Sequence, residues 1–320
     1  MAANEGSTGV KMVTVPEDRD GQRLDNFLLL QFKGAPRSLI YKLVRSGQVR
    51  INGKRAKPDS RLVGGDEVRL PPVKLNEPGE VRPTPQGLLD RLAASIVFED
   101  KALLAVNKPS GLATHGGSGI SHGLIEALRA LRPGEPLELV HRLDRDTSGV
   151  ILVAKKRSAL LELQQLMRGG EDDEGPGKKY LALLVGRVPN GTLTVDRPLE
   201  KSLLQGGERR VRVDPAGKPS VSHFKVIERL AGHSFCEVRI ETGRTHQIRV
   251  HAAHLGHPVA GDDKYGDEAA NKRLSQQVGL KRLFLHAASI EFALEKGSKP
   301  YLINAPLSDD LKAVLDRLGK

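Results

Sequence analysis

The chain has 320 residues and a formal charge of +11, with 50 Lys and Arg side chains against 39 Asp and Glu. This length and 38% hydrophobic residues suffice for one catalytic domain and a small accessory domain, and the basic balance indicates a polyanion partner. The single cysteine, Cys236, excludes an internal disulfide framework, and no run approaches the roughly 18 apolar residues of a membrane span. The polar start MAANEGSTGVKM is unlike a secretory signal, so we expect a soluble, cytoplasmic protein.

The first part of the chain predicts a small α/β unit after a polar leader at residues 1–20. GQRLDNFLLLQF and RSLIYKLVRSG have the apolar spacing of two short helices, and Gly47 ends the second. VRINGKR predicts a hairpin with its turn at Asn52–Gly53, and EVRL predicts a further strand after the turn at Gly65–Asp66. We expect this unit to occupy residues 21–71.

Basic side chains without an acidic neighbour gather in this unit. They are Arg37, Lys42, Arg45, Arg50, Lys54, Arg55 and Lys57. On charge alone, a solvated basic face is as good an interpretation as an RNA-binding surface.

Residues 72–94 are rich in proline and predict a linker, and residues 95–320 predict a catalytic domain. Short turns between apolar segments favour an antiparallel or mixed sheet with packed helices, an α+β arrangement. Strands are expected in SIVFED, ALLAVNK, ELVH, GVILVAKK, KKYLALLVG, ERRVRVD, SVSHFKVIERL and SFCEVRIE; helices are expected in HGLIEALRAL, RSALLELQQLM and SDDLKAVLDRL, the last capped by Ser308. The acidic, glycine-rich residues 169–177 predict a loop.

Charged residues follow an apolar strand in LVHRLDRDTSGVILVAKK. One interpretation is structural, with Asp144 and Asp146 forming turns and pairing with Arg142 and Arg145. The other is a reactive loop placed at a strand end.

Four further segments favour the reactive loop. They are NKPSGLATHGG, KKYLALLVG, ETGRTHQIRVH and RLFLHAASIEF. Together with HRLDRDTSG, they occur in an order and spacing that resemble the pseudouridine synthases of the large ribosomal subunit and related RNAs, from Ser95 to the C-terminus. The resemblance implies the pseudouridine synthase fold, with a mixed, mainly antiparallel sheet flanked by helices. Residues 21–71 resemble the S-four RNA-binding module, which implies docking on structured RNA through phosphates.

The resemblance also implies roles for particular residues. It places the family's catalytic aspartate on Asp144, its active-site tyrosine on Tyr180 and the basic partner of the aspartate on Arg249. Arg142 takes the position of an arginine that enters the RNA stack beside the extruded nucleotide, and Asp146 occupies a variable position.

These residue types suit the reaction that the resemblance implies. Converting uridine to pseudouridine breaks the bond from ribose to nitrogen and forms one to carbon 5 of the same base, so we expect no cofactor and no metal. The reaction needs a carboxylate near the ribose, as a nucleophile or a base, and a basic neighbour stabilises that carboxylate. The nucleotide must leave its stack at a cost of about a few kcal/mol. The expected partner is large-subunit ribosomal RNA or the assembling large subunit, bound by a monomer without membrane contact.

Several alternatives stay open at this point. His246, His251, His254 and His257 suggest a metal site, but their spacing does not match a zinc-binding helix. Arg249 alone would be interpreted as a surface charge on a helix and Tyr180 as an ordinary strand aromatic, while Cys236 is expected to be a buried, inert thiol. At the level of function, the alternatives are a sibling enzyme for other ribosomal or transfer RNA uridines, or a non-catalytic assembly factor.

Overall fold

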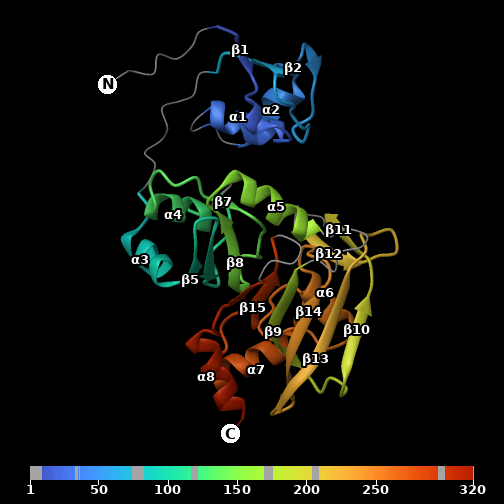
Figure 1. Ribbon diagram of the computed structural model, residues 1–320. Coiled ribbons are helices and arrows are strands. Elements are labelled where there is room, and N and C mark those ends of the chain that lie inside the picture. Colours follow the sequence, from blue (N-terminus) through green and yellow to red (C-terminus); the bar gives the residue numbers. More distant parts are fainter. Residues whose placement is uncertain are drawn as a thin grey trace. The chain divides into compact units, whose positions relative to one another are not determined.

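The computed structural model describes residues 9–32, 35, 37–73, 83–116, 122–168, 176–203, 209–294 and 300–319. The chain divides into two compact units, Met1–Pro83 and Thr84–Lys320, each of which we describe by itself (Figure 1). Three elements lie outside the segments expected to be folded. The strand β1 (Lys11–Thr14) and the short 3-10 helix η1 (Glu17–Arg19) fall in the predicted leader, and the helix α3 (Gln86–Ala94) falls in the predicted linker.

The first unit is a small sheet with two helices. The order of its strands is β1–β4–β2–β3, and every pairing in it is antiparallel. Both predicted helices, the hairpin and the strand EVRL are confirmed; the elements are α1 (Leu24–Gln31), α2 (Arg37–Arg45), β2 (Arg50–Ile51), β3 (Lys54–Arg55) and β4 (Glu67–Leu70). At the hairpin turn Asn52 and Gly53 have φ angles of 48° and 75°, which is the left-handed pair that a two-residue turn of this type requires.

The second unit is built on a sheet of ten described strands, so the α+β expectation is confirmed. Its order is β10–β13–β14–β9–β15–β8–β6–β5, with β16 beside β15 and β7 beside β8, and β8 with β15 is the parallel pair among otherwise antiparallel pairings. The strands are β5 (Ile96–Glu99), β6 (Leu103–Lys108), β7 (Glu138–Leu139), β8 (Ser148–Ala154), β9 (Gly177–Val185), β10 (Thr192–Asp196), β13 (Val221–Leu230), β14 (His233–Ile240), β15 (Leu285–Phe292) and β16 (Tyr301–Asn304). A separate hairpin consists of β11 (Leu199–Leu203) and β12 (Arg209–Val213).

Helices pack on different parts of this sheet. Figure 1 shows α3 and α4 (Leu124–Leu131) near β5, and α7 (Glu268–Val278) with α8 (Asp309–Leu318) at the end where the chain terminates. The other two are α5 (Arg157–Arg168) and α6 (Gln247–His254). Ser308 is the N-cap residue of α8, as expected, but its hydroxyl accepts a hydrogen bond from Arg282 Nη2 at 2.7 Å and does not cap the helix.

A close contact between β8 and β15 sets the position of the segment that precedes β8. Gly149 has φ 112° and pairs with Ala287, and a Cβ atom there would collide with the Ala287 carbonyl oxygen. Ala287 pairs on its other side with Tyr180 of β9. The loop at 141–147 is therefore only two strands away from Tyr180.

Candidate active site

The loop at 141–147 is held by hydrogen bonds to neighbouring backbone. His141 Nε2 accepts from the backbone N–H of Leu152 at 3.1 Å, and Ser110 Oγ donates to the carbonyl oxygen of Asp146 at 2.7 Å. Because both ends of the loop are fixed, Asp144 has a defined place between them. Its side chain is 19% exposed and lines a small cavity of about 70 Å³.

The structure brings together the four residues that the resemblance assigned to the catalytic domain. Asp144, Tyr180, Arg249 and Arg142 all line this cavity, although they come from β9, α6 and the loop before β8. Asp144 Oδ2 lies 3.8 Å from Arg249 Nη1 and 3.8 Å from His246 Nε2. At these distances two positive or polar groups face the carboxylate without saturating it by short hydrogen bonds.

Arg249 is a buried member of the site, so its interpretation as a surface helix charge is wrong. Only 6% of the residue is exposed. Its Nε and Nη2 donate to the two carboxylate oxygens of Asp262, each at 2.7 Å. Burial alone would raise the pKa of Asp262, but the bonds from Arg249 and from backbone N–H groups hold it below its usual value. This two-point bond leaves Arg249 Nη1 directed at Asp144.

His246 connects Asp144 to Tyr265. It precedes α6 in the left-handed region, with φ 54°, and its Nδ1 lies 2.8 Å from Tyr265 Oη. Tyr265 Oη also accepts a bond from the backbone N–H of Val211 at 2.9 Å, so its own proton is best donated to His246 Nδ1. The remaining imidazole proton is then on Nε2, which faces Asp144. Burial lowers the pKa of His246 and so favours this neutral form, although Asp144 opposes the shift.

Tyr180 lies in the sheet next to β15 and contributes a partly buried ring to the same cavity. Burial, and to a lesser extent the charge of Asp144, raises the pKa of its phenol. The side chain is therefore neutral at physiological pH and can present its ring or donate its proton.

A wider cavity of about 480 Å³ opens from Asp144 toward solvent. Basic side chains dominate its lining: Arg142, Arg145, Arg210, Arg249 and Lys264. Asp146 lies there too, but its carboxylate pairs with Arg145 at 3.0 Å and not with Arg249. This positive opening suits a phosphate backbone.

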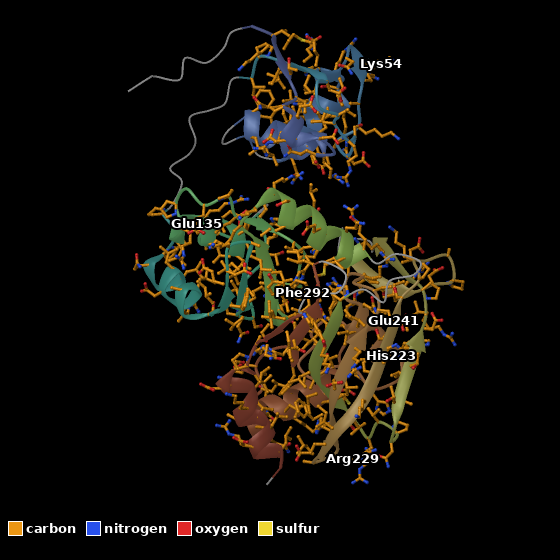
Figure 2. The ribbon with its side chains drawn as sticks, viewed as in Figure 1. Lys54, Glu135, His223, Arg229, Glu241 and Phe292 are labelled. Carbon is orange, nitrogen blue, oxygen red and sulfur yellow. The ribbon has the colours of Figure 1, made fainter. Side chains whose placement is uncertain are left out.

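The basic residues predicted in the first unit belong to a separate part of the chain. Lys42, Arg45, Lys54 and Arg55 are exposed, and Lys54 lies at the hairpin (Figure 2). Arg50 is exposed as well, yet its guanidinium donates to the carbonyl oxygens of Gly47 at 3.4 Å and Gly53 at 3.3 Å. The side chain of Arg37 is outside the described part of the structure, as are residues 169–175 of the acidic loop.

Among the histidines considered as metal ligands, His251 and His257, like His246, have separate partners. His251 bonds Ser222 Oγ through Nδ1 at 2.9 Å and the carbonyl oxygen of Arg197 through Nε2 at 3.0 Å. His257 Nδ1 bonds the carbonyl oxygen of Val185 at 3.0 Å. Within the described ranges, no group of three or more His, Cys, Asp or Glu side chains is arranged to hold a metal ion.

Two other sequence interpretations can be compared with the structure. Cys236 is buried in β14, and this burial raises the pKa of its thiol to about 12, in keeping with an inert side chain. Among the helices in the described ranges, none has the length and apolar character needed to cross a bilayer.

Asp262 and Tyr265 were not identified from the sequence, and His246 was considered only as a metal ligand. One signal was available for Asp262, because a buried arginine needs an acidic partner and GDDKYG follows the HQIR segment closely. Nothing in the sequence indicated the left-handed conformation of His246 or its bond to Tyr265.

Comparisons with known proteins identify the family of the chain. The RNA pseudouridylate synthase family model matches residues 102–254, and the S4 domain model matches residues 22–68. The chain belongs to the RNA pseudouridylate synthase family, and it is accordingly an isomerase. It is 51% identical to the ribosomal large subunit pseudouridine synthase C of Escherichia coli O157:H7 and to that of Salmonella typhi, in each case over 97% of both chains.

A solved structure gives the same result for the fold. The human RNA pseudouridylate synthase domain containing 4 matches with a TM-score of 0.58 and 27% identity, covering 72% of this chain and 95% of the human one. The segments KPSG, HGGSG and RLFLHAA resemble the large-subunit enzyme designated C in particular, and these relatives confirm that resemblance.

Proposed function

We propose that this enzyme converts uridine to pseudouridine in large-subunit ribosomal RNA, with Asp144 as its catalytic carboxylate. The observation that carries the proposal is the position of Asp144 Oδ2, 3.8 Å from both Arg249 Nη1 and His246 Nε2 in a cavity shared with Tyr180. The names of its relatives support the choice of RNA.

The reaction exchanges one bond for another within a single nucleotide. The bond from ribose C1′ to N1 of the base breaks, the base turns, and a bond from C1′ to C5 forms, while a proton leaves C5 and N1 gains one. Asp144 acts as a nucleophile at the ribose or as the base that begins elimination. No atom is added and no electron is lost, so the proposal includes neither a metal nor a cofactor.

The neighbours of Asp144 have distinct parts in this proposal. Arg249, fixed by Asp262, stabilises the negative carboxylate and positions it. The neutral ring of Tyr180 confines the detached base. Arg142 is exposed at the rim of both cavities, where its side chain can fill the gap left by the extruded nucleotide.

The first unit then supplies additional RNA affinity through exposed basic residues such as Lys42, Arg45, Lys54 and Arg55. Arg37 and Arg50 complete the proposed set of RNA-binding residues. Arg50 contributes mainly by supporting the hairpin turn through its hydrogen bonds to Gly47 and Gly53. We propose that the enzyme works as a monomer in the cytoplasm, on free RNA or on an assembling large subunit.

The experiment that tests the function is tritium release from carbon 5 of uridine in substrate RNA under single-turnover conditions. Asp144→Asn should abolish release but leave the fold and RNA binding nearly intact, because an amide is neither a carboxylate nucleophile nor a base for the ribose proton. Asp146→Asn is the matched control: it removes the same charge in the same loop, at a carboxylate that pairs with Arg145, and it should stay active. Turnover near the wild-type rate in the Asp144 variant would overturn the mechanism.

The choice of target is tested separately. Carbodiimide-based mapping of pseudouridine in total RNA, with and without the gene, should show missing modifications in large-subunit RNA. Losses confined to transfer RNA would identify a sibling enzyme, and no loss at all would favour an assembly factor.

A further inference from the structure

A separate cavity, called the second cavity below, lies against the catalytic cavity of about 70 Å³ that Asp144 lines. Gly243 and Arg244 line both the catalytic cavity and a hollow of about 450 Å³. Residues of β11 and β12, the turn at 216–218 and the segment 243–245 enclose this second cavity. A ligand that occupies both must therefore pass Arg244.

The wall between the two cavities is rigid. Gln247 is 3% exposed, and its Oε1 accepts hydrogen bonds from Thr242 Oγ1 at 2.7 Å and from the backbone N–H of Arg244 at 3.0 Å. Its Nε2 donates to the Val221 carbonyl oxygen at 2.8 Å and to Ser222 Oγ at 3.0 Å. A side chain bonded at both ends holds the segment 242–244, so the boundary between the two cavities is in place before any ligand arrives.

The lining of the second cavity combines an apolar floor with a basic rim. Leu199 and Val211 are buried and pack together with Val250 beneath it. Lys201, Lys218 and Arg244 are exposed around it. The acidic member of the lining, Glu200, lies 3.7 Å from Arg212 Nη2, which offsets part of its charge. Such a surface suits a nucleotide whose flat base lies on the apolar floor and whose phosphate lies at the basic rim.

The size and position of the second cavity further restrict which ligands it can hold. Its volume falls within the range of about 300–1,000 Å³ that small-ligand pockets span. A strand that delivers its uridine to Asp144 continues through a phosphodiester to the next nucleotide, and Arg244 is a basic residue that lines both cavities. Bases of single-stranded RNA are commonly splayed apart when proteins recognise them.

We infer that the second cavity holds the nucleotide next to the target uridine on the same strand, with its base over Leu199 and Val211 and its phosphate at Arg244. The inference rests on the proposed function. It makes the enzyme read two consecutive nucleotides, one in each cavity.

The test uses short RNAs that carry a tritiated uridine at a mapped target, with an abasic ribose on one side or the other. For the wild type, one of the two abasic RNAs should have kcat/KM lowered on the order of tenfold. Ala216→Trp places a large ring in the second cavity from an exposed turn position, so it should cause a similar loss on intact RNA. It should cause no further loss on that abasic RNA. Pro215→Trp, an exposed neighbour outside the lining, should behave as wild type.

A failure of this inference can be distinguished from a failure of the proposed function. If both abasic RNAs react as the intact one does, or if Ala216→Trp lowers kcat/KM equally on every RNA, the second cavity holds no neighbouring nucleotide. If the wild type releases no tritium from intact mapped RNA, the proposed function itself is contradicted.

Discussion

Lys108 donates a hydrogen bond from Nζ to the carbonyl oxygen of Arg145 at 2.9 Å, in the loop that carries Asp144. The same ammonium donates to the carbonyl oxygens of Pro109 at 3.0 Å and Leu112 at 2.9 Å, and the side chain is fully buried. Burial lowers the pKa of Lys108 to about 7, while the charges of Asp146 and Asp144 oppose that shift. The Pro109 and Leu112 carbonyl groups follow β6, whereas that of Arg145 is in the catalytic loop, so the ammonium joins these two segments.

Replacing Lys108 should therefore damage both the fold and the site. Lys108→Met removes the donor from three carbonyl groups in part-buried hydrogen bonds, and a fully buried group left unsatisfied costs about 1–3 kcal/mol. We expect a lower free energy of unfolding in urea and slower tritium release. Lys101→Met removes an exposed lysine in the turn between β5 and β6 and should change neither quantity. Equal urea midpoints for the Lys108 variant and the wild type would contradict this role.

Short-range patterns in the sequence predicted most elements, but the pairs that complete the site depend on tertiary contacts. Asn52–Gly53 has a local turn preference, and the spacing of apolar residues defined α5 and α8, so each was predicted correctly. In contrast, Arg249 finds Asp262 across a loop without a recognisable motif. Asp144 was identified because its whole motif resembles a family, not because its surroundings were predictable.

The basic residues of the first unit give a prediction about salt. Reversing Lys42, Arg45 and Lys54 to Glu should weaken RNA binding and flatten its dependence on salt, because each lost phosphate contact removes roughly 0.7–0.9 from the slope of log K against log salt. Arg50 is better left in place, since its bonds to Gly47 and Gly53 support the turn.

A charge-matched variant controls for the change in net charge. Lys225, Lys272 and Lys312 are exposed on the second unit, and reversing them changes the charge by the same amount. This control should keep a slope close to that of the wild type. Identical slopes for both triple variants would show that the basic face of the first unit is merely solvated.

His141 predicts a loss of stability in acid. Burial, together with the charge of Lys178, lowers the pKa of His141 from 6.5 to about 3, and its Nε2 accepts the bond from Leu152 in the neutral form. Between these two values the unfolded chain binds a proton that the folded chain does not. The contribution of His141 is therefore complete above about pH 6.5 and is lost progressively as the pH falls toward 3. His141→Gln keeps an acceptor without titrating.

The measurement compares urea midpoints at pH 7 and pH 5. The wild type should lose more stability between these two pH values than His141→Gln does, because only the wild type has at position 141 an imidazole that is neutral when folded and gains a proton on unfolding. Parallel losses in the two proteins would show that His141 contributes nothing to the acid sensitivity.

The hydroxyl of Tyr265 should matter for turnover although it does not contact Asp144. Tyr265→Phe keeps the ring that lies 5.2 Å from Arg249 Cζ, but it removes the oxygen shared by His246 Nδ1 and the Val211 N–H. Without that donor, His246 can carry its proton on either nitrogen, and Nε2 no longer always presents an N–H to Asp144. We expect single-turnover rates to fall roughly 10- to 100-fold, the equivalent of about 1–3 kcal/mol, with little change in RNA affinity.

The pH dependence separates this positioning role from a general loss of stability. A hydrogen bond donated to Nδ1 opposes protonation at that nitrogen, so removing it should raise the pKa of His246 and move the acid limb of the rate profile to higher pH. Tyr301→Phe is the matched control, because it removes the same hydroxyl from a bond to Asp100 Oδ2 at 3.0 Å, a residue that does not line the catalytic cavity. It should lower stability without moving the profile. If Tyr265→Phe reacts at the wild-type rate with an unshifted acid limb, the Tyr265 hydroxyl does not hold the proton of His246 on the nitrogen that faces Asp144.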